Sequence, residues 1–592
     1  MISLGRVSTV TDISIIADLN ILKGHTAMLD CIVVGYHEYE PVDLDTSQDL
    51  LDDLMRDMSE MPAPLRGILR SEVRVEGRLL PYLEAMSYWH HGPKLRQGKV
   101  TGSVYSVAEM PSLGTLYLVN FLRKRGHSID FVNSFTYEQE KLADLLARDP
   151  LSIAITTTFY MSSAPVIEIV RFIRKHNPAT KIIVGGPLID NYCRALDKDR
   201  LKRIFDRIGA DIYIWESQGE TTLNQTVAAL KRQLPLDDIA NLFSKSGSSW
   251  NFARRLPENN DLNESAVDWS GFEPNELGET VSARTARSCA FSCAFCDYPA
   301  RAGALALADI VTVERELEAL VNLGVRRVAF IDDTFNVPMP RFKELCQMMV
   351  RRNFGLEWFS YFRCGNAKEE WIYDLMWDAG CRGVLLGVES GDDSVLKNME
   401  KKARSADYRF GMEQLKKRGI FMHASTVVGF PGETRETVSN TINFINETAP
   451  DTFTVNHWYY LHATPIHRRA TEFGLNGDGF NWSHDTMTSQ EAMDAADMMF
   501  EEVTEAAWMP VNGLDFWGVP YLMGKGMTGD QIVQFLRLSK ELTPLSLEFR
   551  GRELSDRSQL PSVEDKGAQN LREFCESLSL SEGRYKKDLN AA

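Results

Sequence analysis

The chain has 592 residues, an apolar fraction of 44% and a formal net charge of −17, as expected for a globular protein of three or four domains. The negative charge and the lack of a basic stripe argue against a nucleic-acid substrate, because phosphate binding needs clustered Lys and Arg. No apolar run reaches the roughly 20 residues of a membrane span, and residues 1–26 lack the pattern of a signal peptide. We therefore expect a cytoplasmic protein that acts on a small molecule.

The N-terminal third predicts alternating strands and helices. Residues 1–27 are interpreted as an irregular extension, with Met28 as an alternative start, and 38–105 as an acidic insertion with short helices. This alternation predicts an α/β fold with a doubly wound parallel sheet over 28–235. The strands are expected at 28–36, 129–132, 152–158, 181–184 and 210–215, and the helices at 113–122, 137–148 and 164–176.

Three loops at the ends of these strands are candidates for ligand binding. In doubly wound sheets the ligand lies at the carboxyl ends of the strands. Glycines let a large ligand approach the backbone, and hydroxyl groups can hydrogen-bond to it, although each loop could also be an ordinary turn. The candidate residues are Thr156, Thr157, Thr158, Gly185, Gly186, Trp215, Glu216, Gly219 and Glu220.

A second α/β series follows residues 236–280, which have the composition of a linker. It covers 281–488, and polar residues follow its strands, where barrel-type folds place their chemistry. Residues 489–552 predict a helical C-terminal domain, whose aromatic stretch 514–526 either lines a cavity or packs in the core. Residues 553–592 are charged and predict a mobile tail. The strands of the second series are expected at 327–331, 356–364, 383–388, 421–428 and 452–456.

The most specific motif is the C-x3-C-x2-C spacing of Cys289, Cys293 and Cys296, three of only nine cysteines in the chain. A tetrahedral zinc site would need a fourth ligand nearby. A [4Fe–4S] cluster held by three thiolates instead leaves one iron open for a ligand that is not protein. A structural zinc loop or a chance cluster is the alternative, and Cys346, Cys364 and Cys381 are expected to be core residues.

This spacing resembles that of the radical S-adenosylmethionine (radical SAM) superfamily, over about 281–470. The resemblance implies a partial (β/α) barrel in which SAM chelates the open iron. An ammonium and a ribose diol both favour carboxylate partners, although a helix N-cap or a salt bridge would also explain such carboxylates. The positions that correspond to SAM contacts are Phe295 and the Gly429–Gly432 turn (adenine), Asp332 and Asp333 (amino group) and Glu389 (ribose hydroxyls).

Taken in order, the loops of the first sheet resemble the Rossmann-like cobalamin-binding domain of cobalamin-dependent radical SAM proteins, over 28–235. The Asp-x-His-x-x-Gly loop of many cobalamin domains is absent, so the lower axial ligand stays open. His127, in the turn Arg125–Ser128, is expected to face solvent.

Within that group the chain is most similar to the PhpK-like P-methyltransferases, over about 28–550, on residues 30–35, 131–135, 183–187 and the aromatic stretch. The resemblance implies methyl transfer from SAM by way of methylcobalamin to an unactivated carbon or a phosphinate phosphorus of a secondary metabolite. The electrons would come from a donor such as flavodoxin or ferredoxin. One alternative is a cobalamin-dependent radical SAM enzyme that catalyses an oxidation, cyclisation or rearrangement without methyl transfer. The other is a cobalamin-binding sensor or a structural Fe–S module without turnover. No catalytic side chain is predicted.

Overall fold

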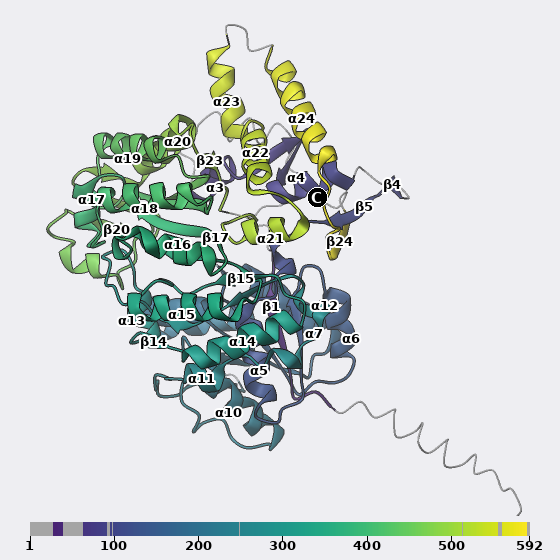
Figure 1. Cartoon of the computed structure of the whole chain (residues 1–592). Helices are drawn as coiled ribbons and strands as arrows, with labels where there is room; N and C mark the ends of the chain where they lie inside the picture. The colour runs from purple at the N-terminus through teal and green to yellow at the C-terminus, as the bar shows by residue number, and fades with distance from the viewer. Residues whose placement is uncertain are drawn as a thin grey trace, which may run out of the picture.

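The computed structural model describes residues 28–38, 63–91, 95–96, 99–160, 162–247, 249–511, 513–554 and 559–588. The predicted extension 1–27 and a large part of the insertion lie outside these residues. Within them, two seven-stranded sheets account for most strands (Figure 1). No helix in the described part of the chain is both long and apolar enough to cross a bilayer.

The first sheet has the order β11-β10-β9-β8-β7-β1-β6, and its five strands from β9 to β6 are parallel. Because β1 lies between β6 and β7, the direction of winding reverses there, which creates a topological switch point. The strands are almost continuous apolar runs because helices cover both faces. They are β1 (Cys31–Tyr36), β6 (Ile129–Ser134), β7 (Ser152–Thr156), β8 (Lys181–Gly185) and β9 (Ile212–Ile214).

Helices α6, α7, α8 and α9 share one core cluster with the first sheet, whereas α5 and α10 pack in the other. Polar caps define several of these helices: Ser112 caps α5 and Asp197 caps α9. The helices are α5 (Leu113–Arg123), α6 (Gln139–Leu146), α7 (Ala164–His176), α8 (Pro187–Ala195), α9 (Lys198–Ile208) and α10 (Glu220–Lys231).

The prediction of a linker over 236–280 is wrong in its first part. Strands β10 (Leu242–Ser246) and β11 (Ser249–Phe252) extend the first sheet in antiparallel fashion. Residues of β11 are partly or fully exposed, so this edge strand carries many polar residues and gives only a weak strand pattern. The short helices α11 (Leu262–Ser265) and α12 (Pro274–Leu277) complete the segment.

The second sheet has the order β12-β15-β16-β17-β18-β19-β23, with every pair parallel. Its end strands do not pair with each other, so it is an open, partial barrel. The last strand lies in the region predicted to be purely helical; with only two residues it is too short to show a pattern. The strands are β12 (Thr280–Ala283), β15 (Arg327–Phe330), β16 (Glu357–Phe362), β17 (Cys381–Glu389), β18 (Phe421–Val428), β19 (Thr452–His457) and β23 (Ala507–Trp508).

Helices follow the strands of the second sheet in the expected alternation. Those that cross between neighbouring strands are α14 (Ile310–Asn322), α15 (Met339–Arg352), α16 (Glu370–Asp378), α18 (Ser405–Lys417), α19 (Arg435–Thr448) and α20 (Ser489–Glu502). The α/β prediction of a doubly wound sheet, a partial barrel and a helical C-terminal region is therefore confirmed in its main features.

The prediction of a mobile tail after residue 553 is wrong over 560–588. Helix α24 (Leu560–Ser577) buries Leu571 and Cys575 and packs against α4 (Tyr82–His91) of the insertion. Figure 1 shows these two helices, from opposite ends of the chain, side by side. Strand β24 (Tyr585–Asp588) then pairs with β5 (Lys99–Val104). The remaining C-terminal helices are α21 (Gly518–Lys525), α22 (Gly529–Lys540) and α23 (Pro544–Glu553).

A buried ion cluster ties the insertion to the barrel. Arg66, in α3 (Ala63–Ile68), donates from Nε to Asp497 of α20 at 2.7 Å, and Arg70 donates from Nη1 to the same carboxylate at 2.9 Å. All three side chains are buried. Burial raises the pKa of Asp497, and the two arginines oppose this shift. Charges out of water are stable only in such hydrogen-bonded pairs.

We expect Asp497→Ala to destabilise the protein by about 3–5 kcal/mol, because it leaves the buried guanidinium of Arg70 without its carboxylate and that of Arg66 with only the exposed Asp494. The fall would be measured as a lower apparent melting temperature. Asp494→Ala is the matched control: Asp494 also contacts Arg66, at 2.7 Å, but is 59% exposed, so its loss should cost at most about 1 kcal/mol. Equal effects of the two substitutions would contradict this assignment.

Candidate active site

The cysteine motif lies in a loop closed by a two-stranded ladder, β13 (Ala286–Arg287) with β14 (Ala306–Leu307). Cys289 and Cys296 are partly exposed and Cys293 is buried. A turn joins the last two, since Cys296 N donates to Cys293 O at 3.0 Å. The Sγ atom of Cys289 lies 3.1 Å from Oγ1 of Thr334, which follows β15. The loop therefore lies at the carboxyl edge of the second sheet.

Asp332 anchors the start of this loop. Its buried carboxylate accepts hydrogen bonds from Thr285 N at 2.7 Å, Thr285 Oγ1 at 2.5 Å and Ala286 N at 3.0 Å. Arg341 of α15 donates to Thr285 Oγ1 and Thr285 O, both at 3.1 Å. Asp332 was predicted to bind the SAM amino group, but here its oxygens are used within the protein, and its role is to position the loop.

The three thiols act on one another electrostatically. Burial, together with the neighbouring Cys293, Asp297 and Cys289, raises the pKa of Cys296 to about 11. Three neighbouring thiolates repel one another unless a cation lies between them, and the iron ions of a cluster supply that charge. Among the described residues, no three His, Cys, Asp or Glu side chains already meet the geometry of a metal site. The assignment of a cluster to this loop therefore rests on the presence of three thiols as ligands.

Asp333, unlike Asp332, faces an accessible space. It is exposed by area, yet desolvation by the surrounding protein and the adjacent Asp332 raise its pKa to about 7, while a hydrogen bond from Tyr298 opposes the shift. A carboxyl that is accessible but desolvated faces a confined space rather than bulk water. It therefore remains the candidate for a ligand ammonium.

Glu389 ends β17 in the left-handed backbone region, with φ at 63°. Its Oε1 atom accepts a hydrogen bond from Lys401 Nζ at 2.6 Å, and both side chains are buried. The ammonium of Lys401 also lies 5.6 Å from the ring centre of Phe295. Glu389 thus forms the salt bridge that the sequence analysis gave as the alternative to ribose binding. Because Lys401 also lies near Phe295, this ion pair places Glu389 beside the cysteine loop.

Phe295 and the Gly429–Gly432 turn lie next to each other, as the resemblance requires. The ring of Phe295 meets that of Phe430 edge-on, at 6.3 Å between centroids. Gly429 has φ at 94°, and a Cβ atom there would stand 2.6 Å from the ring of Trp482. Only glycine therefore allows the turn to approach this closely.

Arg363 is a candidate site residue that the sequence analysis missed. It follows β16 and is 6% exposed, and its Nε and Nη2 atoms have no hydrogen-bond partner in the described part of the chain. Its guanidinium lies 3.8 Å from the ring centre of Phe291 in the cysteine loop. A buried cation with unused donors fits a carboxylate ligand. The sequence signal that could have identified Arg363 is its position directly after a predicted strand.

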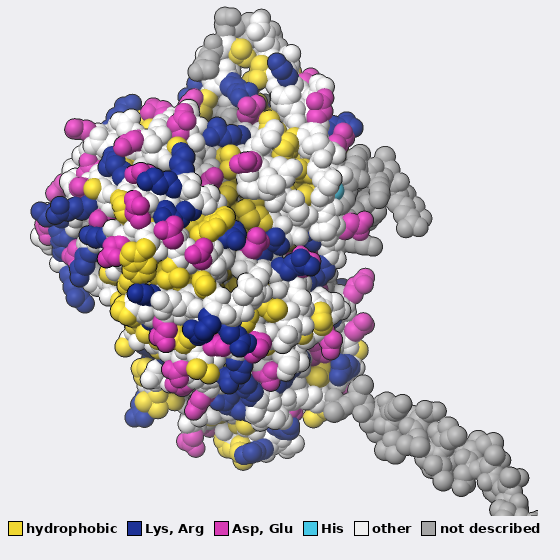
Figure 2. All heavy atoms as spheres, viewed as in Figure 1, with side chains coloured by type: hydrophobic (Ala, Val, Ile, Leu, Met, Phe, Trp, Pro, Cys, Tyr) yellow, Lys and Arg dark blue, Asp and Glu magenta, His cyan; other side chains and the backbone are white. Residues whose placement is uncertain are grey.

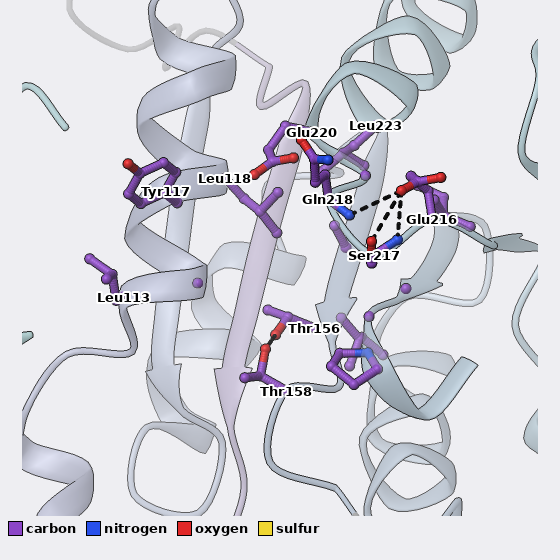
Figure 3. Close-up of a pocket in the computed structure, with 18 of the residues that line it drawn as sticks. Leu113, Tyr117, Leu118, Thr156, Thr158, Glu216, Ser217, Gln218, Glu220 and Leu223 are labelled. Carbon is purple, nitrogen blue, oxygen red and sulfur yellow. Dashed lines mark hydrogen bonds between the residues drawn. The ribbon is translucent and has the colours of Figure 1, made fainter. Parts of the chain in front are cut away.

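A cavity of about 240 Å³ lies at the carboxyl ends of β7, β8 and β9, between α5 and α10. Figure 3 shows α5 with Tyr117 on one side and the 216–220 loop on the other. Thr156 and Thr158 line it, with their hydroxyls 3.2 Å apart. Of the nine predicted ligand-binding residues, seven line this cavity: Thr156, Thr158, Gly185, Gly186, Glu216, Gly219 and Glu220.

Thr157 and Trp215 lie outside the cavity. Thr157 donates to Gly185 O at 2.9 Å and accepts from Leu188 N at 3.2 Å, which stabilises the turn after β8. The Trp215 indole donates to Asp190 Oδ1 at 3.1 Å. Successive strand residues point to opposite faces, and the sequence could not show which face bears the cavity.

Two residues of the second sheet also line the cavity: Arg284, after β12, and Ile331, after β15. The carboxyl edges of the two sheets therefore face each other, with the cavity and the cysteine loop between them. Among the described residues that line this cavity there is no histidine. His127 was expected to face solvent, which is wrong: its side chain is 8% exposed and contacts Asn224 and Asp30.

The aromatic C-terminal stretch contributes to both packing and an accessible surface. Phe516 is buried against Phe359 and His423 of the barrel. Trp517 is partly exposed and lies 5.3 Å from Tyr361 of β16, measured between ring centres. Cys346, Cys364 and Cys381 lie in the core, consistent with the sequence interpretation.

Residues 284–445 match the family model of the radical SAM superfamily. The chain contains a radical SAM domain. The matched segment begins at Arg284, directly after β12, and includes the cysteine loop, Asp333, Arg363, Glu389 and the Gly429 turn. The predicted radical SAM domain is thereby confirmed.

Two curated relatives extend beyond the radical SAM domain. An uncharacterised methyltransferase of Pyrococcus horikoshii is 24% identical over 347 residues, which cover 56% of this chain and 72% of the relative. An anaerobic magnesium-protoporphyrin IX monomethyl ester cyclase of Cereibacter sphaeroides is 23% identical over 386 residues, which cover 59% of each protein. The chain thus aligns with little more than half of the cyclase.

Two solved structures share the fold. The radical SAM methyltransferase TsrM from Kitasatospora setae, determined with cobalamin and a [4Fe–4S] cluster, has a TM-score of 0.50 at 19% identity, covering 61% of this chain and 75% of TsrM. OxsB, a cobalamin-dependent S-adenosylmethionine radical enzyme with aqua-cobalamin bound, has a TM-score of 0.52 at 15% identity, covering 78% and 77%. At this identity the similarity establishes the architecture alone.

We expect the affinity for SAM to rise roughly fivefold or more between pH 6 and pH 7.5, because Asp333 ionises over this range while an α-ammonium group stays largely charged. Equilibrium dialysis with the anaerobically reconstituted protein measures this slope. Asp333→Asn should bind weakly with no such slope, whereas Asp378→Asn, a change at an exposed surface carboxylate, should keep it. The same slope in Asp333→Asn would exclude this role.

Proposed function

We propose that this protein is a cobalamin-dependent radical SAM methyltransferase that acts on a small molecule. The observation that carries the proposal is the shared wall of the cavity: Arg284 and Ile331 of the radical SAM domain line a pocket whose other walls belong to the first sheet. A ligand in this pocket and a cluster on the cysteine loop would therefore lie on the same side of both sheets. The fold of this chain, which TsrM and OxsB share, supports the same arrangement.

Cys289, Cys293 and Cys296 would hold the [4Fe–4S] cluster, since they are the thiols of the radical SAM motif. When bound, the cluster and SAM supply one-electron cleavage of a carbon–sulfur bond, and cobalamin supplies methyl transfer. Around SAM, Asp333 would attract the ammonium, Arg363 the carboxylate and Glu389 the ribose hydroxyls. The roles of these residues follow from their charges and their places at the carboxyl ends of β15, β16 and β17.

The cavity suits a part of cobalamin by the chemistry of its lining. Leucine and isoleucine side chains of α5, α10 and the sheet form an apolar wall, and glycines at 185 and 186 leave the backbone accessible. Glu216 is 3% exposed, and its Oε2 atom has no hydrogen-bond partner in the described structure. An amide-rich ligand would satisfy this buried oxygen.

A small substrate fits the place where three segments meet. Asp515 acts electrostatically on both Tyr36, at the end of β1, and Tyr361 of β16. It is exposed by area, yet desolvation raises its pKa to about 6. The ring of Trp517 meets that of Tyr361 edge-on, so these side chains come together near the carboxyl ends of β1 and β16. Figure 2 shows hydrophobic side chains along the seam between the upper and lower halves of the molecule.

The substrate we propose is a secondary metabolite methylated at an unactivated carbon or at a phosphinate phosphorus. An external donor of the flavodoxin or ferredoxin type would reduce the cluster. A confined, water-poor site is required for such chemistry, because reactive species would otherwise be quenched.

The second candidate is a cobalamin-dependent radical SAM enzyme that catalyses an oxidation, cyclisation or rearrangement. The similarity to the cyclase of Cereibacter sphaeroides favours it. The two candidates differ in their products from SAM: methyl transfer forms S-adenosylhomocysteine, whereas a non-methylating reaction forms 5′-deoxyadenosine alone.

The test is anaerobic incubation of the reduced, cobalamin-loaded protein with SAM that carries a deuterated methyl group. We expect S-adenosylhomocysteine and transfer of the label to the protein-bound cobalamin fraction, both measured by mass spectrometry. Release of 5′-deoxyadenosine without S-adenosylhomocysteine would favour the second candidate.

Cys293→Ala should abolish the visible absorbance of the cluster, because only two thiolates of the motif remain. Cobalamin binding should persist, since no motif cysteine lines the cavity. Cys346→Ala is the control: this thiol is buried in α15, and its loss should leave the cluster intact. Equal loss of cobalamin and cluster in Cys293→Ala would contradict two separate sites.

A further inference from the structure

We propose that Lys401 is a positioning residue whose buried ammonium group stabilises the reduced state of the cluster that Cys289, Cys293 and Cys296 would hold. Lys401 acts on the cluster through the thiolate of Cys293, and at the same time it orients Glu389. This inference rests on the proposed function, because it assumes a [4Fe–4S] cluster on the cysteine loop. It assigns to one side chain a part in setting the reduction potential of that cluster.

The backbone around Lys401 sends this side chain into the protein. Lys401 lies between α17 (Asp393–Asn398) and α18, and its neighbours Glu400 and Lys402 both have φ at 52°. Such left-handed conformations are uncommon for residues with a side chain, and they concentrate at functional sites. Glu400 and Lys402 are exposed, whereas Lys401 is 7% exposed. Of three successive charged residues, the turn therefore buries the middle one.

The same segment is attached to the cysteine loop. The backbone N of Ala294 donates to Met399 O at 2.8 Å, two residues before Lys401. The ammonium lies 5.6 Å from the ring centre of Phe295. Cys293, which directly precedes Ala294, acts electrostatically on this ammonium. Lys401 is thus held near one thiol of the motif by contacts within the protein.

Glu389 is the counter-ion of this ammonium, at 2.6 Å from Oε1 to Nζ. A Cβ atom at Gly387 would stand 2.6 Å from that oxygen and 3.1 Å from Nζ, so a glycine leaves the room that the pair occupies. Burial by itself would lower the pKa of Lys401, but the attraction of Glu389, Tyr408 and Cys293 raises it above the usual value. The side chain therefore stays positively charged.

A fixed positive charge beside a cluster favours its reduced state, because reduction adds one negative charge to the cluster and its thiolates. The external donor loses one electron and the cluster gains it, and no bond forms or breaks in this step. The effect is stronger in a buried site than in water, since the effective dielectric constant is lower. Glu389 offsets part of the charge of Lys401. Loss of Lys401 and loss of Glu389 should therefore shift the potential in opposite directions, whereas a purely structural ion pair gives no such opposition.

The experiment is a potentiometric titration of the anaerobically reconstituted full-length protein without SAM, in which EPR spectroscopy measures the reduced cluster. At the midpoint potential of the wild type, we expect Lys401→Met to lower the ratio of reduced to oxidised cluster about tenfold, which for one electron is a downward shift of about 59 mV. Lys401→Arg keeps the charge and should stay near the wild-type potential. Glu389→Gln leaves the ammonium without its counter-ion and should shift the potential upward.

Lys402→Met is the matched control, because Lys402 is the exposed neighbour of Lys401, and its potential should equal that of the wild type. Iron content and visible absorbance show whether each variant holds a cluster. If Lys401→Met assembles none, Glu389→Gln decides: an upward shift supports the inference, and any other result overturns it. Equal potentials of Lys401→Met and the wild type, or an equal shift in Lys402→Met, would overturn this inference alone. Failure of the wild type to assemble a four-iron cluster would overturn the proposed function as well.

Discussion

The position of the cysteine loop depends on one buried carboxylate, that of Asp332. A buried anion is stable only when hydrogen-bond donors surround it, and here the donors are the backbone and side chain of Thr285 and the backbone of Ala286. These bonds tie the end of β12 to the end of β15, directly before the loop begins. The thiols, Thr334 and Asp333 are therefore held in one place by a contact that is itself no part of ligand binding.

The two sheets face each other with their carboxyl edges, and this arrangement brings the cavity and the cysteine loop to the same part of the molecule. Parallel strands place their variable loops at one edge, and both sheets turn that edge toward the other. The cavity shows this directly, because Arg284 and Ile331 complete a pocket built by the first sheet. The buried cluster of Arg66, Arg70 and Asp497 and the pairing of α24 with α4 tie the outer segments to this core.

The strands and helices of both sheets could be predicted because each is a continuous apolar run or an amphipathic helix, and α7 and β18 have the expected bounds. The strands β11 and β23 could not, because β11 lies at an edge with an exposed face and β23 has only two residues. Helix α24 looked like a mobile tail because few of its residues are apolar; its stability comes from α4, some 480 residues earlier in the chain. In the site, Arg363 and Lys401 were missed because single basic residues after a strand resemble ordinary surface charges.

By itself, the sequence determined the local features: the thiol spacing, the alternation of strands and helices, and the polar residues that follow each strand. These depend on neighbours along the chain and on the period of the secondary structure. Only the tertiary structure decided which of two adjacent aspartates is exposed and which is buried, that Thr156 and Thr158 but not Thr157 line the cavity, and that Arg284 reaches it. The direction of a side chain in a loop is set by hydrogen bonds to distant segments, such as those from Thr285 to Asp332, and no local pattern encodes them.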